Sequence, residues 1–227
     1  MTFSQLVMAG LGFTPIFCLS LSIFGAIPLH MSLRFVIPVV AASQIVLGRR
    51  NPELGRRLIF GLLAGMIATG VYDLLRLYIA LLGVWGDFIP NIGNRALHSD
   101  SVSPIWGYCW RYLLNGGCLG MAFSVLPLRG IRQGIAYGTF VCSCLFATLL
   151  FAPGAQDALF HLTWTTGAGA MVGHWIYGAT LGGILLLWCP EPAMAGRKFR
   201  AEEDAEPDLE LESDKEVRSY EQVYLVR

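Results

Sequence analysis

The stretch GAGAMVGHWIYGATLGGILLLWC (167–189) contains no Asp, Glu, Lys or Arg. A helix of about 20 apolar residues crosses the hydrocarbon core of a bilayer, so this stretch predicts a transmembrane helix. The rest of the chain agrees with this prediction. Of 227 residues, 55% are hydrophobic and 14% are charged, whereas soluble domains carry roughly 25% charged residues. The sequence therefore predicts an all-α fold, a polytopic membrane helix bundle.

Other apolar runs predict the remaining spans. Clear candidates occupy residues 6–29, 58–84, 105–128 and 134–153. The run 31–48 is weaker, because it is short and contains Arg34, Pro38 and Gln44. It could cross the membrane, or it could form a re-entrant or interfacial segment. The short turn PLHMS (28–32) suits a tight hairpin, so we expect about six transmembrane helices, with five as the alternative.

Basic loops predict the orientation. Lys and Arg cluster in residues 48–57, 128–134 and 196–200. If the spans alternate, these three segments lie on one side of the membrane. Basic loops favour the cytoplasmic side, so we expect a multi-pass protein of a bacterial inner membrane with its C-terminus in the cytoplasm.

The chain divides into two regions by composition. Residues 1–195 contain the predicted transmembrane bundle, and residues 196–227 form an acidic tail. The densely charged part, 201–216, predicts a disordered cytoplasmic segment. Residues 219–227 regain Tyr, Val and Leu, which fits either a docking peptide for a cytoplasmic partner or a solvated chain end.

Small residues recur at helical spacing in two of the spans. Gly61 and Gly65 share one helix face, and Gly178 and Gly182 form a second G-x-x-x-G pair. Such pairs let helix backbones approach closely in lipid. We expect both faces to be helix-packing surfaces.

Polar residues lie on the same faces. Asp73 follows Gly65 by two steps of four residues, and Arg76 is three residues further on. Arg111 and Asn115 are four apart in the 105–128 span. Because residues three or four apart are neighbours on a helix, each span turns its polar groups to one side.

The last span follows the same rule. His174 shares a face with Gly178, and Tyr177 lies beside it. At about 1.5 Å rise per residue, Arg76, Arg111 and His174 each lie roughly 6–8 Å outward of their span midpoints. The sequence therefore predicts one polar layer that comprises Asp73, Arg76, Arg111, Asn115, His174 and Tyr177.

Two interpretations of this layer are open. Ionisable groups in a span cost about 2.5–3.5 kcal/mol each, so they pair or line a wet cavity. Asp73 can neutralise one arginine, and the partner of the other must come from the outer loops, where Asp87, Asp100 and Asp157 lie. The layer is then either an internal network that fixes helix register or an outward-opening pocket with a slight positive excess. Such a pocket would suit a carboxylate, a phosphate or a lipid headgroup.

Cofactor and enzyme motifs are missing from the sequence. None of the six cysteines and four histidines has zinc-site spacing, and no two histidines share a clear helix face. We therefore predict no metal, no haem and no other cofactor. The sequence has no G-x-S-x-G, H-E-x-x-H or P-loop motif, and we expect no nucleic-acid partner.

Two stretches carry a resemblance. GYCWRYLLNGGCLGMAF (107–123) and GHWIYGATLGGIL (173–185) resemble spans of small, uncharacterised multi-span proteins of the bacterial inner membrane. The matching positions are Gly107, Tyr108, Asn115, Gly116, Gly120, His174, Tyr177 and Gly178. Arg111 stands where such proteins often have histidine. The resemblance covers about the last three spans and implies no known activity.

Three functional hypotheses follow. The first is a non-catalytic subunit or scaffold of a larger membrane assembly, with protein partners or self-association, that holds a lipid or an anionic group in the polar pocket. The second is a small transporter or channel for an anionic or amphiphilic solute. The third is a membrane enzyme that acts on a lipid or quinone, with His174 or Asp73 as the acid or base.

Overall fold

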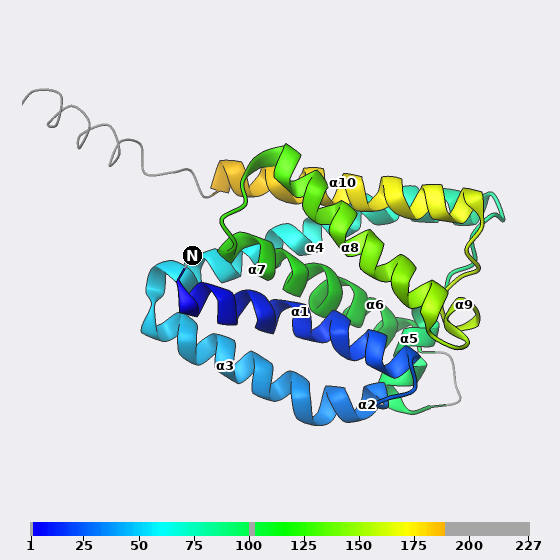
Figure 1. Cartoon of the computed structure of the whole chain (residues 1–227), viewed down its shortest axis with the longest axis horizontal. Coiled ribbons are helices and arrows are strands. Elements are labelled where there is room, and N and C mark those ends of the chain that lie inside the picture. The colour runs from blue at the N-terminus through cyan, green and yellow to red at the C-terminus, as the bar shows by residue number, and fades with distance from the viewer. Residues whose placement is uncertain (1, 100–102, 189–227) are drawn as a thin grey trace, which may run out of the picture. The chain divides into compact units, whose positions relative to one another are not determined.

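The computed structural model describes residues 2–99 and 103–188, which form helices and turns with no strand. Figure 1 shows the long helices packed side by side in one bundle. The elements are α1 (Phe3–Ile23), α2 (Leu29–Met31), the π-helix η1 (Ser32–Val36), α3 (Ile37–Arg50), α4 (Pro52–Leu81), α5 (Ile89–Leu97), α6 (Pro104–Cys109), the π-helix η2 (Trp110–Gly117), α7 (Cys118–Val125), α8 (Gly130–Phe151), α9 (Ala155–Ala158) and α10 (Trp164–Trp188). The predicted all-α membrane bundle is confirmed.

Five helices are long and apolar enough to cross a membrane: Phe3–Ile23, Leu29–Arg50, Pro52–Leu81, Gly130–Phe151 and Trp164–Trp188. The weak run 31–48 falls in the second of these, a helix of 22 residues. The protein is therefore a multi-pass membrane protein. A further continuous helical run, 104–125, consists of α6, η2 and α7 and corresponds to the span expected at 105–128.

Local signals explain where α1 and α4 begin. The hydroxyl of Thr2 accepts a hydrogen bond from the Gln5 backbone, and the Gln5 side chain accepts one from the Thr2 backbone, which is a capping box. The side chain of Asn51 accepts from the Leu54 backbone at 3.1 Å, and a proline occupies the first turn of α4. These caps satisfy backbone N–H groups that have no partner inside the helix.

The long helices begin and end at two opposite ends of the bundle, and a hydrophobic cluster lies toward each end. At one end, a hydrophobic cluster joins Met8 of α1, Leu54 of α4 and Val125 of α7. The terminal turns of α3, α4 and α8, with the residue before α8, carry the basic residues Arg49, Arg50, Arg56, Arg57, Arg129 and Arg132. At the other end, a second cluster joins Leu29, Ile89 and Phe160. The described basic loops thus lie at one end of the bundle, as the alternating spans require.

Glycine pairs set the closest helix contacts. A Cβ added to Gly61 would lie 2.6 Å from the carbonyl oxygen of Gly120, and one added to Gly65 would meet the carbonyl of Gly116. Only glycine lets α4 pack this closely on η2 and α7.

The same arrangement joins α8 and α10. A Cβ on Gly178 would meet the carbonyl of Gly134, and a Cβ on Gly182 would meet the carbonyl of Gly130. The backbones of α8 and α10 therefore leave no room for a side chain at these positions. Both predicted glycine faces therefore lie at helix–helix contacts. The acidic tail, 196–227, and its terminal segment, 219–227, lie outside the described residues.

Candidate functional site: a charged network beside an intramembrane cavity

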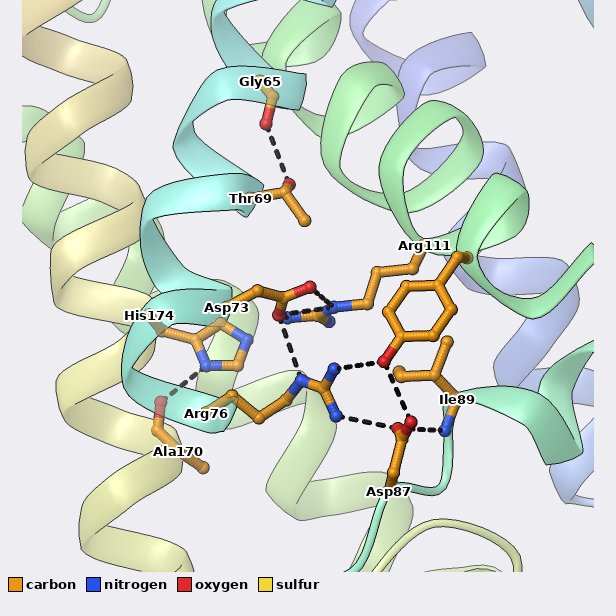
Figure 2. Close-up of polar contacts among 10 residues, drawn as sticks. Gly65, Thr69, Asp73, Arg76, Asp87, Ile89, Arg111, Ala170 and His174 are labelled. Atoms are coloured by element: carbon orange, nitrogen blue, oxygen red, sulfur yellow. Dashed lines mark hydrogen bonds and ion pairs between the residues drawn. The ribbon is translucent and has the colours of Figure 1, made fainter. Parts of the chain in front are cut away.

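The carboxylate of Asp73 on α4 lies between two arginines. Nε of Arg111 donates to Asp73 Oδ1 at 2.8 Å, and Nε of Arg76 donates to the same oxygen at 3.1 Å. Figure 2 shows the three side chains meeting, with Arg111 reaching across from a neighbouring helix. Asp73 is 2% exposed and Arg76 1%, so this charge cluster is closed to bulk solvent.

A second carboxylate completes the cluster. Nη1 of Arg76 donates to Asp87 Oδ1 at 2.9 Å, and Nη2 donates to the hydroxyl of Tyr108 at 3.0 Å. That hydroxyl donates in turn to the other oxygen of Asp87, at 2.9 Å, and the backbone N–H of Ile89 donates to Asp87 Oδ1. Arg76 therefore connects α4 to the start of α5 and to α6.

Asp87 lies in the loop outside the spans, where its titration matters for stability. Partial burial raises the pKa of this carboxyl, but the hydrogen bonds from Tyr108, Arg76 and the Ile89 backbone lower it by more. The pKa of Asp87 consequently lies below the ordinary aspartate value. Hydrogen bonds to the ionised form favour that form.

The network contains two arginines and two aspartates, so its charges balance. The sequence named Asp87 as one of three outer-loop partners for the second arginine, and Asp87 is the one that the structure places there. With both arginines paired, the slight positive excess expected from sequence is not what the structure shows. Removing one partner of a buried ion pair is strongly destabilising, because the remaining charge is left without compensation.

A cavity of about 360 Å³ lies next to this network. Residues of α1, α4, α5, η2, α7, α8 and α10 line it, and most of them are apolar. Its lining includes Phe17, Tyr72, Arg111, Asn115, Phe140 and His174. Its size falls at the lower end of the range of about 300–1,000 Å³ that holds small ligands.

The amide, guanidinium and imidazole side chains of the lining occupy one wall of the cavity, and the hydroxyls of Ser20 and Thr148 belong to α1 and α8 on another side. Arg111 and Asn115 come from η2, and His174 comes from α10. The guanidinium of Arg111 also lies 4.9 Å from the centre of the Tyr72 ring, a cation–π distance. Arg111 is therefore the residue that joins the charge network to the cavity.

Hydrogen bonds orient the side chains of Asn115 and His174. The indole N–H of Trp110 donates to Asn115 Oδ1 at 2.9 Å, which leaves the amide nitrogen of Asn115 as the free end. Nδ1 of His174 lies 2.7 Å from the carbonyl oxygen of Ala170 (Figure 2). Because a carbonyl only accepts, Nδ1 carries a proton and Nε2 of the neutral ring is an acceptor.

Tyr177, also expected in the polar layer, has a packing role. Its hydroxyl donates to the carbonyl oxygen of Gly116 at 2.8 Å, and the hydroxyl of Tyr137 donates to that of Leu119 at the same distance. Gly116 belongs to the π-helix η2, where wider turns disturb the usual α-helical bonding. The two tyrosines thus fasten α8 and α10 to the irregular span.

The cavity does not open where the sequence suggested. Toward the outer loops it is lined by buried apolar residues, Ile89 and Ile92 of α5. Its exposed lining residues are instead Phe17 of α1, which is 60% exposed, and Phe140 of α8, which is 54% exposed. Cys144 of α8 is exposed as well. The opening therefore lies between α1 and α8, on the side of the bundle and not at one of its ends.

Two of these features were not predicted from sequence. Short helix α5 lies between the spans expected at 58–84 and 105–128, where we predicted no helix, although its buried face follows helical spacing at Ile89, Ile92 and Ala96. The π-helix η2 carries no composition signal that distinguishes it from an ordinary span. Within the described residues, no three His, Cys, Asp or Glu side chains lie close enough to hold a metal ion.

No protein-family model, curated protein or solved structure matches this chain. The cavity and its polar wall are therefore the features from which a function can be inferred.

Proposed function

We propose that this protein is a non-catalytic membrane subunit that holds one amphiphilic molecule inside its helix bundle. The observation that supports this proposal is the cavity of about 360 Å³, which is mostly apolar, carries Arg111, Asn115 and His174 on one wall and is exposed between α1 and α8. An amphiphile matches such a site because its chain replaces lipid contacts along the apolar lining while its head finds hydrogen-bond partners.

The route of entry follows from the exposed lining. Phe17 and Phe140 lie on apolar spans, so their exposed faces meet acyl chains, not water. A molecule that is already dissolved in the bilayer reaches this opening without crossing an aqueous phase. A water-soluble solute would have to pass the buried residues of α5.

A binding role fits the described residues better than a transport role. A transporter needs a path from its site to each side of the membrane. A second hollow at the basic end of the bundle, lined by residues such as Arg57 and Phe123, has a volume of about 30 Å³ and shares no lining residue with the cavity. The charge network also holds each of its carboxylates between hydrogen-bond donors, which suits a fixed scaffold.

The proposal includes a location and partners. Basic residues at one end of the bundle support a cytoplasmic position for that end in a bacterial inner membrane. On this orientation the acidic tail is cytoplasmic, and it is available to a soluble partner. Partner proteins of the membrane, or a second copy of this chain, would cover part of the exposed apolar surface.

Substitutions that fill the cavity test the proposal. Leu145 on α8 lines the cavity, whereas Leu150 on the same helix is 62% exposed and does not. We expect Leu145→Trp to remove the bound amphiphile and Leu150→Trp to retain it. The measurement is native mass spectrometry of protein purified in a mild detergent, followed by solvent extraction of whatever co-purifies.

The outcomes separate the hypotheses. Equal amounts of ligand on both variants and on the parent would contradict the proposal, because the molecule would then be bound elsewhere. Recovery of a chemically altered product after incubation with a candidate amphiphile would favour the enzyme hypothesis instead.

A further inference from the structure

We infer that the amphiphile is an isoprenoid quinone or its quinol, bound with its ring against Arg111, Asn115 and His174. This inference rests on the proposed function, since it identifies the occupant of the same cavity. It concerns binding only and includes no electron transfer. Four observations lead to it: the charge balance, the hydrogen-bonding groups, the depth of the polar wall and the lining of the apolar part.

The charge balance argues against an anionic headgroup. Arg111 is already paired with Asp73, and Arg76 is shared between Asp73 and Asp87. A phosphate or carboxylate placed against Arg111 would also face the carboxylate of Asp73, which is buried and cannot be screened by water. A neutral head meets no such repulsion.

The hydrogen-bonding groups match a carbonyl or hydroxyl. Among the described residues, Nη1 of Arg111 has no hydrogen bond, and neither does the amide nitrogen of Asn115. Both atoms are donors, so they suit the carbonyl oxygen of a quinone. Nε2 of His174 is an acceptor when Nδ1 donates to Ala170, so it suits the O–H of a quinol.

The polar wall is deeper than a phospholipid headgroup. At about 1.5 Å rise per residue, Asn115 and His174 lie roughly 15 Å from the outer ends of their helices, which begin at Pro104 and Trp164. Phospholipid headgroups lie in the interfacial layer, outside a hydrocarbon core about 30 Å thick. A quinone ring has no obligatory interfacial group and can lie at this depth.

The apolar part of the cavity suits a flat ring and an unsaturated chain. Aromatic side chains surround it, among them Phe13, Tyr72, Phe88 and Phe160. Such rings favour stacked or edge-to-face contacts with a planar partner. The chain of the ligand then leaves between Phe17 and Phe140, where the lining is exposed to lipid.

Equilibrium binding tests the inference directly. Decylubiquinone, a short-chain quinone, and its chemically reduced quinol are titrated into the full-length protein in detergent by isothermal titration calorimetry. Phosphatidylglycerol is titrated in parallel as the anionic alternative. We expect saturable binding of the quinone and the quinol, no competition from phosphatidylglycerol, and loss of binding in Leu145→Trp.

Two substitutions test the head contacts while keeping the local hydrogen bonds. Asn115→Asp retains an oxygen for the Trp110 indole but replaces the free amide donor with a carboxylate oxygen, which repels the carbonyl of the quinone. We expect it to weaken quinone binding by at least about three- to tenfold, the effect of one lost hydrogen bond. The matched control is Asn91→Asp on α5, an exposed position that should leave the Kd unchanged.

His174→Asn distinguishes the two redox forms of the ligand. Its amide can still donate to the Ala170 carbonyl, but the acceptor at Nε2 is lost. We expect about three- to tenfold weaker binding of the quinol, with little change for the quinone. His161→Asn, at a side chain that is 75% exposed, is the control and should bind both forms like the parent.

Each result has a distinct meaning. Binding of phosphatidylglycerol without binding of the quinone would overturn this inference and leave the proposed function standing. Absence of any ligand from the purified protein, together with identical behaviour of Leu145→Trp and the parent, would overturn both. Equal quinol affinity in His174→Asn and His161→Asn would contradict the contact between the quinol hydroxyl and His174.

Discussion

Nη1 of Arg76 lies 2.9 Å from Oδ1 of Asp87, so a buried arginine of α4 pairs with a carboxylate from the loop that follows this helix. The pair joins the long helix α4 to the segment that leads into α5. Tyr108 and the backbone of Ile89 hold the same carboxylate, which draws α6 and α5 into the contact.

Acid should weaken this contact in a predictable direction. The pKa of Asp87 is lowered in the folded protein, because hydrogen bonds from Tyr108, Arg76 and Ile89 outweigh its partial burial. A lowered pKa contributes stability that is complete above the unfolded value of about 3.9 and is lost as the pH falls through the folded pKa. We expect the parent to be more stable than Asp87→Asn at neutral pH and the difference to shrink in acid. Thermal unfolding in detergent, followed from neutral pH downward, measures it; a difference that grows in acid would contradict this sign.

Neutralising Asp73 should lower the free energy of unfolding substantially. Asp73→Asn leaves two arginines, Arg76 and Arg111, with one fewer buried counter-charge. Breaking a buried ion pair costs about 3–5 kcal/mol. The control is Glu53→Gln, which removes a carboxylate that pairs with exposed Arg56 and should cost only about 0–1 kcal/mol. Melting in detergent compares the two variants, and similar losses in both would show that the buried network does not hold the bundle together.

A single methyl group should separate α4 from α7. A Cβ at Gly61 would lie 2.6 Å from the Gly120 carbonyl oxygen, so Gly61→Ala forces the helices apart. We expect a loss of about 1–3 kcal/mol, the usual effect of overpacking. At Gly10 of α1 a Cβ meets nothing within 4 Å, so Gly10→Ala should be neutral or slightly stabilising because alanine is the better helix former. The unfolding midpoint in detergent should therefore fall for Gly61→Ala and stay the same or rise slightly for Gly10→Ala.

The tyrosine hydroxyl that reaches η2 should matter for stability. Tyr177→Phe keeps the ring but leaves the Gly116 carbonyl without its donor at 2.8 Å. A buried acceptor left unsatisfied costs about 1–3 kcal/mol. Tyr78→Phe, at an exposed side chain of α4, is the control and should change stability by no more than about 0.5 kcal/mol. If the two variants melt alike, the Gly116 carbonyl has found another partner.

The sequence predicted the membrane bundle because its signal is a matter of composition. Uncharged apolar runs of this length are typical of transmembrane helices and rare in soluble domains. Even the run 31–48, with its arginine and proline, forms a helix of sufficient length. Helical spacing also predicted that Asp73, Arg76 and Arg111 face the interior. These are local properties that a single helix already carries.

Properties that depend on several helices were not predicted. Three acidic residues were named as partners for the second arginine, and only the path of the loop after α4 selects Asp87. The direction of the cavity opening depends on how α1 and α8 sit beside one another, which no periodicity encodes. The contacts of the π-helix η2 with α4 and α10 likewise join residues far apart in the sequence, such as Gly116 and Tyr177.

The pairing of Arg111 with Asp73 has a consequence for biogenesis. Helix α4 contains two opposite charges, Asp73 and Arg76, which pair within the helix. This pairing offsets part of the cost of inserting either charge into the bilayer. The run 104–125 carries Arg111 with no acidic residue of its own, a burden of about 2.5–3.5 kcal/mol during insertion. That run is synthesised after α4, so the carboxylate of Asp73 precedes Arg111 into the bilayer and its ion pair with Arg111 offsets this cost in the folded bundle.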